Sequence, residues 1–366
     1  MGQPKDCLWD SEPRTLLKHQ AYRRYLGCWM GKVCRRFPMA SIVDAFAGPG
    51  GYRDGPDGSP LVIAKTFMEH VHRERFNTLR LLCVEQRADR RDYLQGLMTS
   101  LAAPPQLEVT VFPAGGVGER FSEVSTAAHV GARRVPTLWI LDPFDYSSMP
   151  FELVRACLRN PHDEVLITVF VDELYRFCED ATKHEAFTRH FGGQHWRTAL
   201  EVSGQAPRKT ALMDAYQQGL ESLPGVTAHR LEVACTNETP RYALMFATHH
   251  AKGLECFTST AWALDPYLGR GVHEQRIGMD TLFDDAPEVN PLRSWVVAQA
   301  GRAVSFRELS AQAARQKFKD SHLRTVLDEL AHDGQAVREH PLQATTPWPQ
   351  ECTVRIYSPE RAAVPR

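Results

Sequence analysis

Asp44-Ala45-Phe46-Ala47-Gly48-Pro49-Gly50 follows the apolar run Ser41–Val43, and the two together predict a strand, a glycine turn and the start of a helix. Glycine permits backbone conformations that other residues avoid, and it lets the main chain approach a ligand closely. Glycine turns after strands bind nucleotides of several kinds or nothing at all. The stretch therefore predicts the local fold and leaves the ligand open.

A second turn, Asp142-Pro143-Phe144-Asp145-Tyr146, follows the predicted strand Thr137–Leu141. Turn chemistry alone accounts for Asp-Pro after a strand. In open α/β sheets, however, ligands bind beyond the carboxyl ends of the parallel strands, and both turns are expected at such ends. Their combination indicates one site built from both turns.

Glu85 ends a third apolar run, Leu81–Val84, which is expected to be the second strand of the same sheet. An acidic residue at this place accepts hydrogen bonds from the ribose hydroxyls of a nucleotide-like cofactor. The simpler alternative is a solvated carboxylate at a strand end. The position in the second strand favours the binding role.

Strands alternate with helices through most of the chain, which predicts a parallel sheet in an α/β fold. Further helices are expected over 13–32, 61–72, 89–101 and 117–129, and further strands over 107–112 and 164–170. Residues 173–222 are mainly helical, charged and aromatic, and we interpret them as an insertion over the strand ends. Strands over 230–235 and 241–248 close the sheet, so residues 1–285 are predicted to form one Rossmann-like domain.

Residues 286–366 are predicted to form a second domain, after a linker at Asp284–Pro291. Helices are expected over 292–300, after a capping box at Ser305–Glu308, and from a cap at Asp320 or Ser321 to about residue 332. A strand pair over 336–339 and 352–356 completes a winged helix-turn-helix pattern. The predicted core of this domain is Leu292, Val296, Leu309, Leu323, Val326, Leu327 and Leu330.

Basic side chains gather where the recognition helix of that pattern begins: Arg315, Lys317, Lys319, His322 and Arg324. Such a cluster is expected to contact nucleic-acid phosphates, and we assign Lys317, Lys319 and Arg324 to substrate binding. Acidic residues follow closely on the same helix and weaken the basic patch. Small winged helices also bind proteins, so both kinds of partner remain open.

The composition is that of an ordinary globular protein, with 366 residues, 43% hydrophobic, 24% charged and a formal net charge of -1. No apolar run approaches the roughly 20 residues of a membrane span, and the first residues lack the apolar core of a signal peptide. The nine cysteines are scattered without a C-x-x-C pair, which argues against a disulfide framework and a zinc site. No histidine pair has carboxylates at metal-ligand spacing. We therefore expect a cytoplasmic protein with no metal site and no membrane contact.

The glycine turn fits the F-x-G-x-G pattern of class I methyltransferases, where the glycines make room for the carboxypropyl chain of S-adenosylmethionine (AdoMet). This resemblance implies AdoMet as the cofactor, contacted by Asp44, Phe46, Ala47, Gly48, Gly50 and Glu85.

The second turn resembles the D-P-P-Y loop of enzymes that methylate an exocyclic base nitrogen. In that loop an acidic or amide side chain and a proline carbonyl accept hydrogen bonds from the target amino group, and an aromatic ring stacks on the base. The resemblance implies catalytic roles for Asp142 and Pro143, with Phe144 or Tyr146 as the stacking ring. The sequence departs from the D-P-P-Y pattern at two positions, because Phe144 replaces the second proline and Asp145 precedes Tyr146. Both departures affect the orientation of the stacking ring.

Most of residues 8–265 resembles the three-Cys-motif partner (TcmP) family, which implies a methyltransferase-like domain and a partner protein that carries the cysteines. The matching stretches include Leu8-Trp9-Asp10, Thr15–His19, Asp44–Tyr52, Gly58-Ser59-Pro60, Asp142–Phe144 and Tyr242–Thr248. The same layout is similar to a bacterial 23S ribosomal RNA adenine-N6 methyltransferase. Lys18 and His19 would otherwise be solvated residues of an amphipathic helix, but their match to the family opening implies a contact with the substrate or with AdoMet. The resemblance also implies substrate contacts by Tyr52 and Ser59.

These features predict transfer of a methyl group from AdoMet to an exocyclic base nitrogen of DNA or RNA, adenine N6 above all. One alternative is a non-catalytic protein of the same fold that binds nucleic acid or a three-Cys-motif partner. Another is a metal-dependent nuclease built on Asp44, Glu85 and Asp142. The glycine spacing and the separate strand ends of these acids disfavour the nuclease.

Overall fold

The computed structural model describes residues 4–131, 134–234, 239–273, 286–340 and 347–358. The chain divides into two compact units, Met1–Thr260 with Arg270–Met279, and Ala261–Gly269 with Asp280–Arg366. This division falls within helix α9 (Ala251–Leu264), before the expected boundary at residue 285. Three residues of the predicted elements, Cys235, Asp284 and Asp285, lie outside the described residues.

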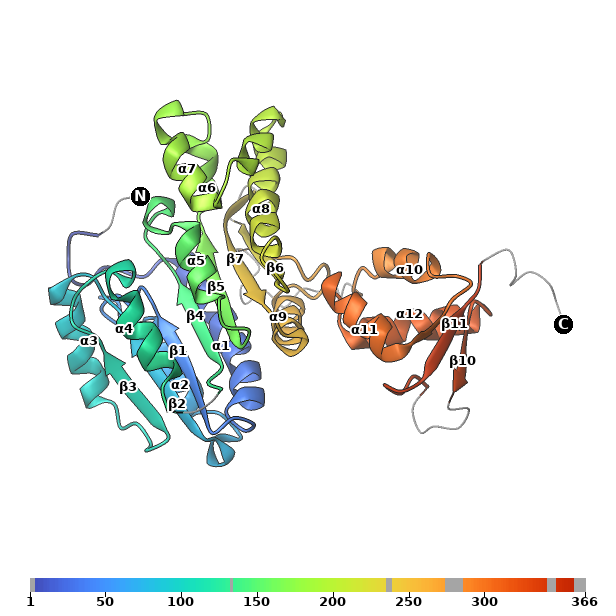
Figure 1. The fold of residues 1–366 in the computed structure, drawn as a ribbon, viewed down its shortest axis with the longest axis horizontal. Coiled ribbons are helices and arrows are strands. Elements are labelled where there is room, and N and C mark those ends of the chain that lie inside the picture. The colour runs from blue at the N-terminus through green and yellow to red at the C-terminus, as the bar shows by residue number, and fades with distance from the viewer. Residues whose placement is uncertain (1–3, 132–133, 235–238, 274–285, 341–346, 359–366) are drawn as a thin grey trace. The chain divides into compact units, whose positions relative to one another are not determined.

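The first unit is built on a sheet in the order β3-β2-β1-β4-β5-β7-β6-β8 (Figure 1). The strands are β1 (Met39–Asp44), β2 (Thr78–Cys83), β3 (Leu107–Val111), β4 (Thr137–Leu141), β5 (Asp163–Val169), β6 (Thr227–Ala234), β7 (Pro240–Thr248) and β8 (Gly271–His273). The first five strands run parallel, and β7 is antiparallel to both β5 and β6. The predicted Rossmann-like α/β sheet is confirmed.

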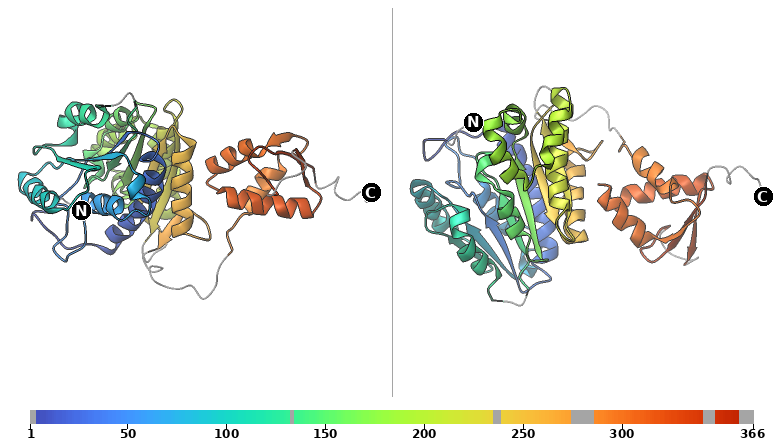
Figure 2. Two further views of the ribbon diagram at one scale, coloured as in Figure 1. Left: turned by 90° about the horizontal axis from the view of Figure 1, so that it is seen from below. Right: turned by 45° about the horizontal axis from the view of Figure 1, so that its top comes forward.

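Helices cover both faces of this sheet (Figure 2). On one face, Tyr25 of α1 (Pro13–Val33) lies 5.1 Å from Phe246 of β7 and 6.0 Å from Phe257 of α9 between ring centroids. Helix α2 (Ser59–Met68) packs beside α1. The other face is covered by α4 (Val117–His129), α5 (Phe151–Cys157) and α8 (Gln205–Glu221), while α3 (Ala88–Ser100) packs at β3.

The central strands are buried and mostly apolar because both faces of the sheet are covered. Every residue of β4 and β5 is buried. Strand β2 begins at Thr78, earlier than the predicted Leu81, and includes Arg80. The guanidinium of Arg80 donates to the carbonyls of Ala127 and Val130 at the end of α4, at 3.2 and 2.6 Å. These hydrogen bonds allow a charged side chain within the strand.

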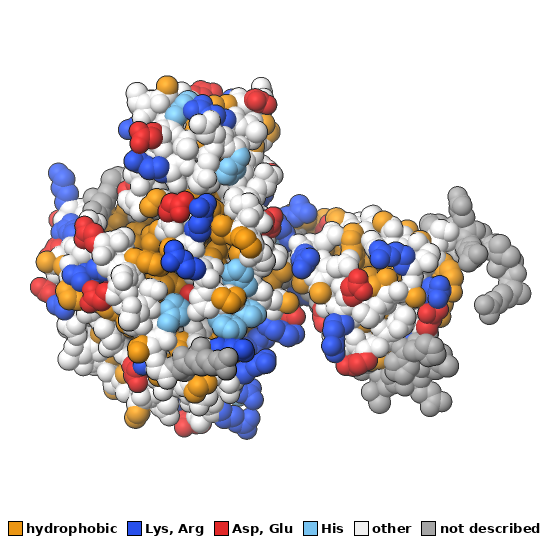
Figure 3. All heavy atoms as spheres, in the orientation of Figure 1, with side chains coloured by type: hydrophobic (Ala, Val, Ile, Leu, Met, Phe, Trp, Pro, Cys, Tyr) orange, Lys and Arg blue, Asp and Glu red, His pale blue; other side chains and the backbone are white. Residues whose placement is uncertain are grey.

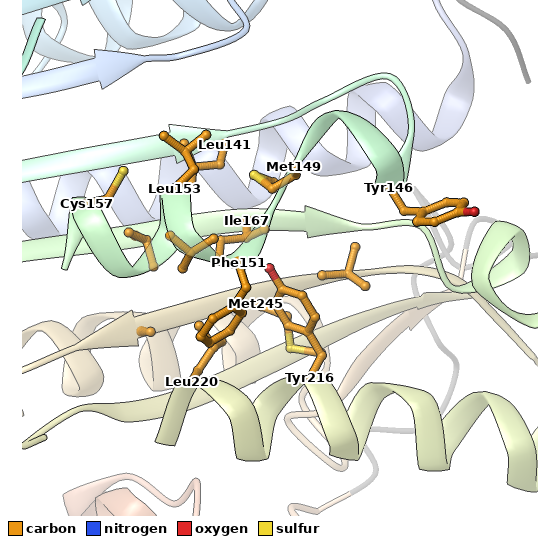
Figure 4. Close-up of a cluster of buried hydrophobic side chains, with 14 of the residues drawn as sticks. Leu141, Tyr146, Met149, Phe151, Leu153, Cys157, Ile167, Tyr216, Leu220 and Met245 are labelled. Atoms are coloured by element: carbon orange, nitrogen blue, oxygen red, sulfur yellow. The ribbon is translucent and has the colours of Figure 1, made fainter. Parts of the chain in front are cut away.

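The insertion after β5 contains α6 (Val171–Phe177), α7 (His184–Phe191), short 3-10 turns and α8, and it is confirmed as mainly helical. Its own apolar side chains join the main core. Figure 4 shows Phe151 of α5, Met245 of β7 and Tyr216 of α8 gathered in this cluster. The insertion is therefore packed onto the sheet through a continuous core.

A disulfide joins Cys28 of α1 to Cys256 of α9, with the Cα atoms 5.7 Å apart. The scattered spacing of the cysteines gave no sign of it, because the two residues are 228 positions apart in sequence. Their proximity arises because both helices pack on the same face of the sheet. The expectation of a chain without disulfide pairing is wrong at this pair.

The second unit contains α10 (Asn290–Val297), β9 (Ala303–Ser305), α11 (Phe306–Arg315), α12 (Asp320–His332), β10 (Ala336–His340) and β11 (Thr353–Ile356). Its strands form an antiparallel sheet in the order β10-β11-β9. All seven predicted core residues are buried. The Ser305 cap is confirmed, since its hydroxyl accepts the backbone N–H of Glu308 at 3.2 Å.

Two predicted boundaries in the second unit are wrong. Helix α10 begins at Asn290, inside the expected linker, because Pro291 fits the first turn of a helix. Helix α12 begins at Asp320 itself, so neither Asp320 nor Ser321 is its cap. Asp320 instead accepts a hydrogen bond from the Ser310 hydroxyl, and the His322 ring takes the N–H of Lys319 at 3.4 Å.

Candidate functional site at the carboxyl ends of the strands

A cavity of about 450 Å³ lies where β1, β4 and β5 end. Most of the predicted site residues line it: Lys18, His19, Phe46, Ala47, Gly48, Gly50, Tyr52, Ser59, Asp142, Pro143 and Phe144. Helix α1, the glycine turn, the start of α2 and the turn after β4 are therefore brought together. Glu85 lines a smaller hollow of about 70 Å³ that shares Phe46 and Phe144 with the cavity.

The glycine turn is held by backbone contacts on both sides. The N–H of Ala47 donates to Val84 at 2.9 Å, and the N–H of Gly58 donates to Gly50 at 2.8 Å. Gly48 and Gly50 have φ of 60° and 82°, so both occupy the left-handed region that favours glycine.

The glycines were expected to leave room for the carboxypropyl chain of AdoMet, but the atoms nearest to them belong to the protein itself. A Cβ on Gly50 would come 2.6 Å from a methyl group of Leu94 in α3, whereas one on Gly48 would lie 3.8 Å from the Trp9 ring. A Cβ on Gly58 would come 2.6 Å from the carbonyl carbon of Gly50. Gly50 and Gly58 are thus required by packing inside the loop, rather than by a Cβ meeting a ligand.

Asp44 is the most unusual carboxyl group of the site. It is fully buried at the end of β1 and is not one of the residues that line either hollow. No well-formed hydrogen bond reaches its oxygens among the described residues, although the Ser59 side chain and the Phe46 N–H act to lower its pKa. Burial raises the pKa of Asp44 to about 7, and the Asp142 carboxylate acts in the same direction, while Ser59 and Lys18 act against them. A buried carboxyl group without partners is a place for a donor or cation that the chain itself does not supply.

Asp142 follows β4 and lines the cavity. Lys18 of α1 forms an ion pair with its Oδ2, and the two side chains are 12% and 16% exposed. Its Oδ1 is buried and has no partner among the described residues. The pair joins residues 124 positions apart and leaves one oxygen ready to accept a hydrogen bond.

His19, next to Lys18, faces the same cavity and is 5% exposed. Burial, with Lys18 as the next cause, lowers the pKa of His19 to about 3, so its imidazole is neutral at physiological pH. Its ring lies 6.2 Å from that of Tyr52. His19 can therefore offer a neutral donor or acceptor, but not a positive charge.

Aromatic rings form one wall of the cavity. Trp9 makes edge contacts with Tyr52 and with Phe144, each at 5.8 Å between centroids. The buried guanidinium of Arg90 lies 4.6 Å from the Trp9 ring and 5.4 Å from the Phe144 ring. Such a group of aromatic faces and edges suits a planar heteroaromatic ring.

Tyr146 is not part of this wall. It is 5% exposed and packs against Phe187 and His190 of the insertion, at 5.0 and 5.8 Å between centroids. Figure 4 shows it among the buried side chains after β4. Of the two rings expected to stack on a base, the structure brings only Phe144 to the cavity.

Glu85 lies two residues beyond the end of β2 and is 3% exposed. Its Oε1 accepts the N–H of Arg87 at 2.7 Å. Burial raises the pKa of Glu85, while the N–H groups of Arg87 and Gly48 and the Arg90 charge act against that rise. The carboxylate is thus close to the N–H groups of Arg87 and of Gly48 in the glycine turn.

Several lining residues were not predicted as site residues. Trp9 comes from the segment before α1, and the others come from the end of β5, from α6 and from β7: Phe170, Asp172, Glu173, Arg176, Arg241 and Tyr242. The sequence did contain a signal for α6, because the insertion was expected over the strand ends. It did not say which of its side chains would reach the cavity.

The basic residues of the second unit are largely engaged within that unit. Arg324 donates to the carbonyl of Trp348 and lies 4.4 Å from the Phe306 ring. Lys319 lies 6.0 Å from the ring of Trp262, and the Trp262 indole N–H donates to the Lys317 carbonyl at 2.6 Å. Arg324 is therefore held by contacts inside the unit, whereas both lysine side chains are partly exposed.

Positive and negative side chains are interspersed over the face of the first unit seen in Figure 3. Across the described ranges, no three His, Cys, Asp or Glu side chains are grouped so that they could hold a metal ion. No helix of the described chain is long and apolar enough to cross a membrane.

No protein-family model matches this chain, and no curated protein matches it either. Among solved structures, Trm1 from Pyrococcus horikoshii with AdoMet is similar over 70% of this chain, with 12% identity and a TM-score of 0.41. The match covers 61% of Trm1, less than two thirds of its length.

Two further solved structures show the same kind of distant likeness. An O-methyltransferase from Bacillus cereus in complex with SAH matches 65% of this chain and 82% of its own, with 12% identity and a TM-score of 0.35. A putative rRNA methylase from Clostridium thermocellum matches 64% of this chain and 94% of its own, with 9% identity and a TM-score of 0.32.

Proposed function

We propose that this protein is an AdoMet-dependent methyltransferase that acts on an exocyclic base nitrogen of nucleic acid, adenine N6 above all. The proposal rests on the partners of the two carboxylate oxygens of Asp142. Lys18 holds one of its oxygens, and the other is buried in the cavity wall without a partner among the described residues. An amino group beside this oxygen would supply the missing hydrogen bond.

The residues of the site fit AdoMet. The two partnerless oxygens of Asp44 suit a ligand that carries an ammonium and a sulfonium group. The hollow beside Glu85 lies next to the glycine turn, where an acid can accept the ribose hydroxyls. Phe46 and Phe144 line both spaces, so the hollow beside Glu85 and the cavity lie on either side of the same two rings.

When bound, AdoMet supplies a methyl group on a positively charged sulfur. The chain's own part is to position the acceptor, because orientation supplies most of the acceleration in such a transfer. Asp142 Oδ1 and the Pro143 carbonyl would accept the two N–H bonds of the amino group and stabilise the positive charge that develops on its nitrogen. The Lys18 ion pair fixes the orientation of the Asp142 carboxylate.

The base itself would lie against the aromatic wall. Phe144 and Trp9 offer ring contacts, and the neutral His19 and Tyr52 can hydrogen-bond to its polar edge. Bases are read in this way when they are extruded or single-stranded. The proposed substrate is therefore a base out of its duplex.

The test is tritium transfer from labelled AdoMet to cellular RNA and DNA. Asp142→Ala is expected to lower the rate by roughly 10²- to 10³-fold while AdoMet affinity changes little, because the side chain meets the acceptor. The control is Asp92→Ala, since Asp92 is 70% exposed and forms an ion pair with the neighbouring Arg91. Tight AdoMet binding without transfer by the wild type to any nucleic acid would contradict the proposal and favour a non-catalytic accessory protein.

We also propose that the second unit is a winged helix that binds nucleic acid. Its helices α11 and α12 followed by the β10–β11 pair support this, with Lys317 and Lys319 between the two helices. A Lys317→Glu, Lys319→Glu double variant should weaken binding at all sequences and flatten the salt dependence by about two phosphate contacts. The matched control reverses the charge of two other exposed residues of this unit, Arg302 and Arg307.

If the lysine variant binds nucleic acid like the wild type at every salt concentration, the second unit is instead a docking surface for a protein. A three-Cys-motif protein is the partner that we propose for such a surface. Coexpression of the two chains and copurification would test that partnership directly.

A further inference from the structure

Four of the charged side chains that line the cavity come from two elements, α6 and β7. Asp172, Glu173 and Arg176 come from α6, and Arg241 comes from β7. Helix α6 begins directly after β5, and β5 pairs with β7, so the sheet itself fixes these side chains near one another. They lie around the same cavity as Asp142 and the aromatic wall.

The two acids of this group already have partners. Asp172 Oδ1 lies 2.5 Å from Nζ of Lys209, a lysine of α8 that is only 1% exposed. A buried ammonium group depends on such a partner, because an unpaired charge in the interior is strongly destabilising. Glu173 accepts the backbone N–H of Tyr146 at 3.2 Å.

The two arginines keep donors to spare. Among the described residues, Arg176 forms no hydrogen bond or salt bridge, and its guanidinium only packs 6.0 Å from the ring of Phe177. Arg241 is 47% exposed and reaches Asp172 at 3.8 Å through Nε. Each guanidinium carries five N–H donors in a planar fork, so both can accept an anion without losing an existing contact.

We propose that Arg176 and Arg241 bind a backbone phosphate of the substrate, next to the nucleotide whose base enters the cavity. This inference rests on the proposed function and specifies its substrate as a phosphate-bearing strand rather than a nucleoside or a free base. Arginine suits this role because its fork matches phosphate oxygens in a bidentate arrangement. Lys209 offsets the charge of Asp172, and the two arginines together outweigh the single remaining charge of Glu173.

The experiment measures the anisotropy of fluorescein-labelled (dA)12 and (A)12 bound to the full-length protein with AdoMet present, over a series of salt concentrations. Arg176→Gln should weaken binding about three- to tenfold at low salt and reduce the salt slope by about 0.7, the value for one phosphate contact on a single strand. In the transfer assay the same variant should raise KM and leave kcat nearly unchanged. Arg241→Gln should act in the same way.

The matched control is Arg189→Gln, which removes an arginine that is 63% exposed on α7 and does not line the cavity. Thermal unfolding of each variant shows whether it is folded, and Arg176→Gln remains informative if Arg241→Gln is not. A strand with one neutral methylphosphonate link beside the target adenine should bind wild type more weakly and Arg176→Gln unchanged.

The outcomes separate this inference from the proposed function. If both arginine variants bind and methylate the oligonucleotides like the wild type at every salt concentration, the phosphate site is refuted and the methyltransferase proposal stands. If the variants lose affinity and salt dependence while the wild type transfers no methyl group, the phosphate site stands and the methyltransferase proposal fails. Absence of oligonucleotide binding by the wild type refutes the inference.

Discussion

The buried carboxyl group of Asp44 predicts that AdoMet binds more tightly as the pH rises toward 7.5. Burial raises the pKa of Asp44 to about 7, so the group is largely protonated at pH 5.5 and largely ionised at pH 7.5. A cationic ligand binds the ionised form, and a nearby positive charge lowers the pKa of a carboxyl group. Binding of AdoMet is therefore expected to release a proton from Asp44.

The magnitude follows from the pKa of the free protein. The fraction of ionised Asp44 rises from about 3% at pH 5.5 to about three quarters at pH 7.5, for a pKa of about 7. If only that form binds, the affinity increases about 25-fold over this range. The range ends at pH 7.5 because the α-amino group of AdoMet, with an ordinary pKa of about 7.7–8.0, begins to titrate above it.

The assay is calorimetric titration with AdoMet at pH 5.5, 6.5 and 7.5, repeated in two buffers of different ionisation enthalpy. The difference in observed heat between the buffers counts the protons released, about 0.5 near pH 7. Asp44→Asn provides the control, since an amide does not titrate and should leave the affinity nearly independent of pH. An affinity that changes less than twofold in the wild type, or an equal slope in Asp44→Asn, would refute the reasoning.

The same shift affects stability. Between the ordinary pKa of 3.8 and the folded value of about 7, the folded state holds a proton that the unfolded state has lost. The free energy of unfolding therefore falls as pH rises through this window. At pH 7.5, Asp44→Asn should stabilise the ligand-free protein by roughly 2 kcal/mol or more in urea denaturation. No stabilisation, with the two proteins equally folded, would contradict the buried and partnerless state of Asp44.

Three further variants test the loop, the second strand end and the core. Gly58→Ala should abolish AdoMet binding in a calorimetric titration, because its Cβ would come within 3 Å of the backbone of the glycine turn, whereas Gly96→Ala, with nothing within 4 Å, should bind normally. Glu85→Ala should weaken AdoMet binding about tenfold or more, the effect of losing a charge-assisted contact worth about 1.5–3 kcal/mol, and equal affinity would remove its ribose role. Gly253→Ala should lower the free energy of unfolding by more than about 2 kcal/mol, since its Cβ would lie 1.8 Å from the buried carboxylate of Glu164; an unchanged urea midpoint would show that the space can relax.

Local patterns in the sequence determined most of the secondary structure and the location of the site. The run through Asp44 predicted β1 and its glycine turn, because apolar strands and glycine turns are properties of neighbouring residues. The predicted helix over 117–129 and strand over 137–141 match α4 and β4. Parallel strands with polar turns after them must bring those turns to one edge, so the meeting of the glycine turn with Asp142 also followed from the pattern.

Only the tertiary structure decided which distant side chains touch. Lys18 pairs with Asp142, 124 positions away, because α1 packs along one face of the sheet with its first turns at the end of β4, and no local pattern records that packing. Tyr146 was an equally good stacking ring in the sequence, but the turn after β4 directs it into the core of the insertion and leaves Phe144 in the cavity. Sequence periodicity reports the face of an element on which a residue lies, whereas its partners depend on how the elements pack.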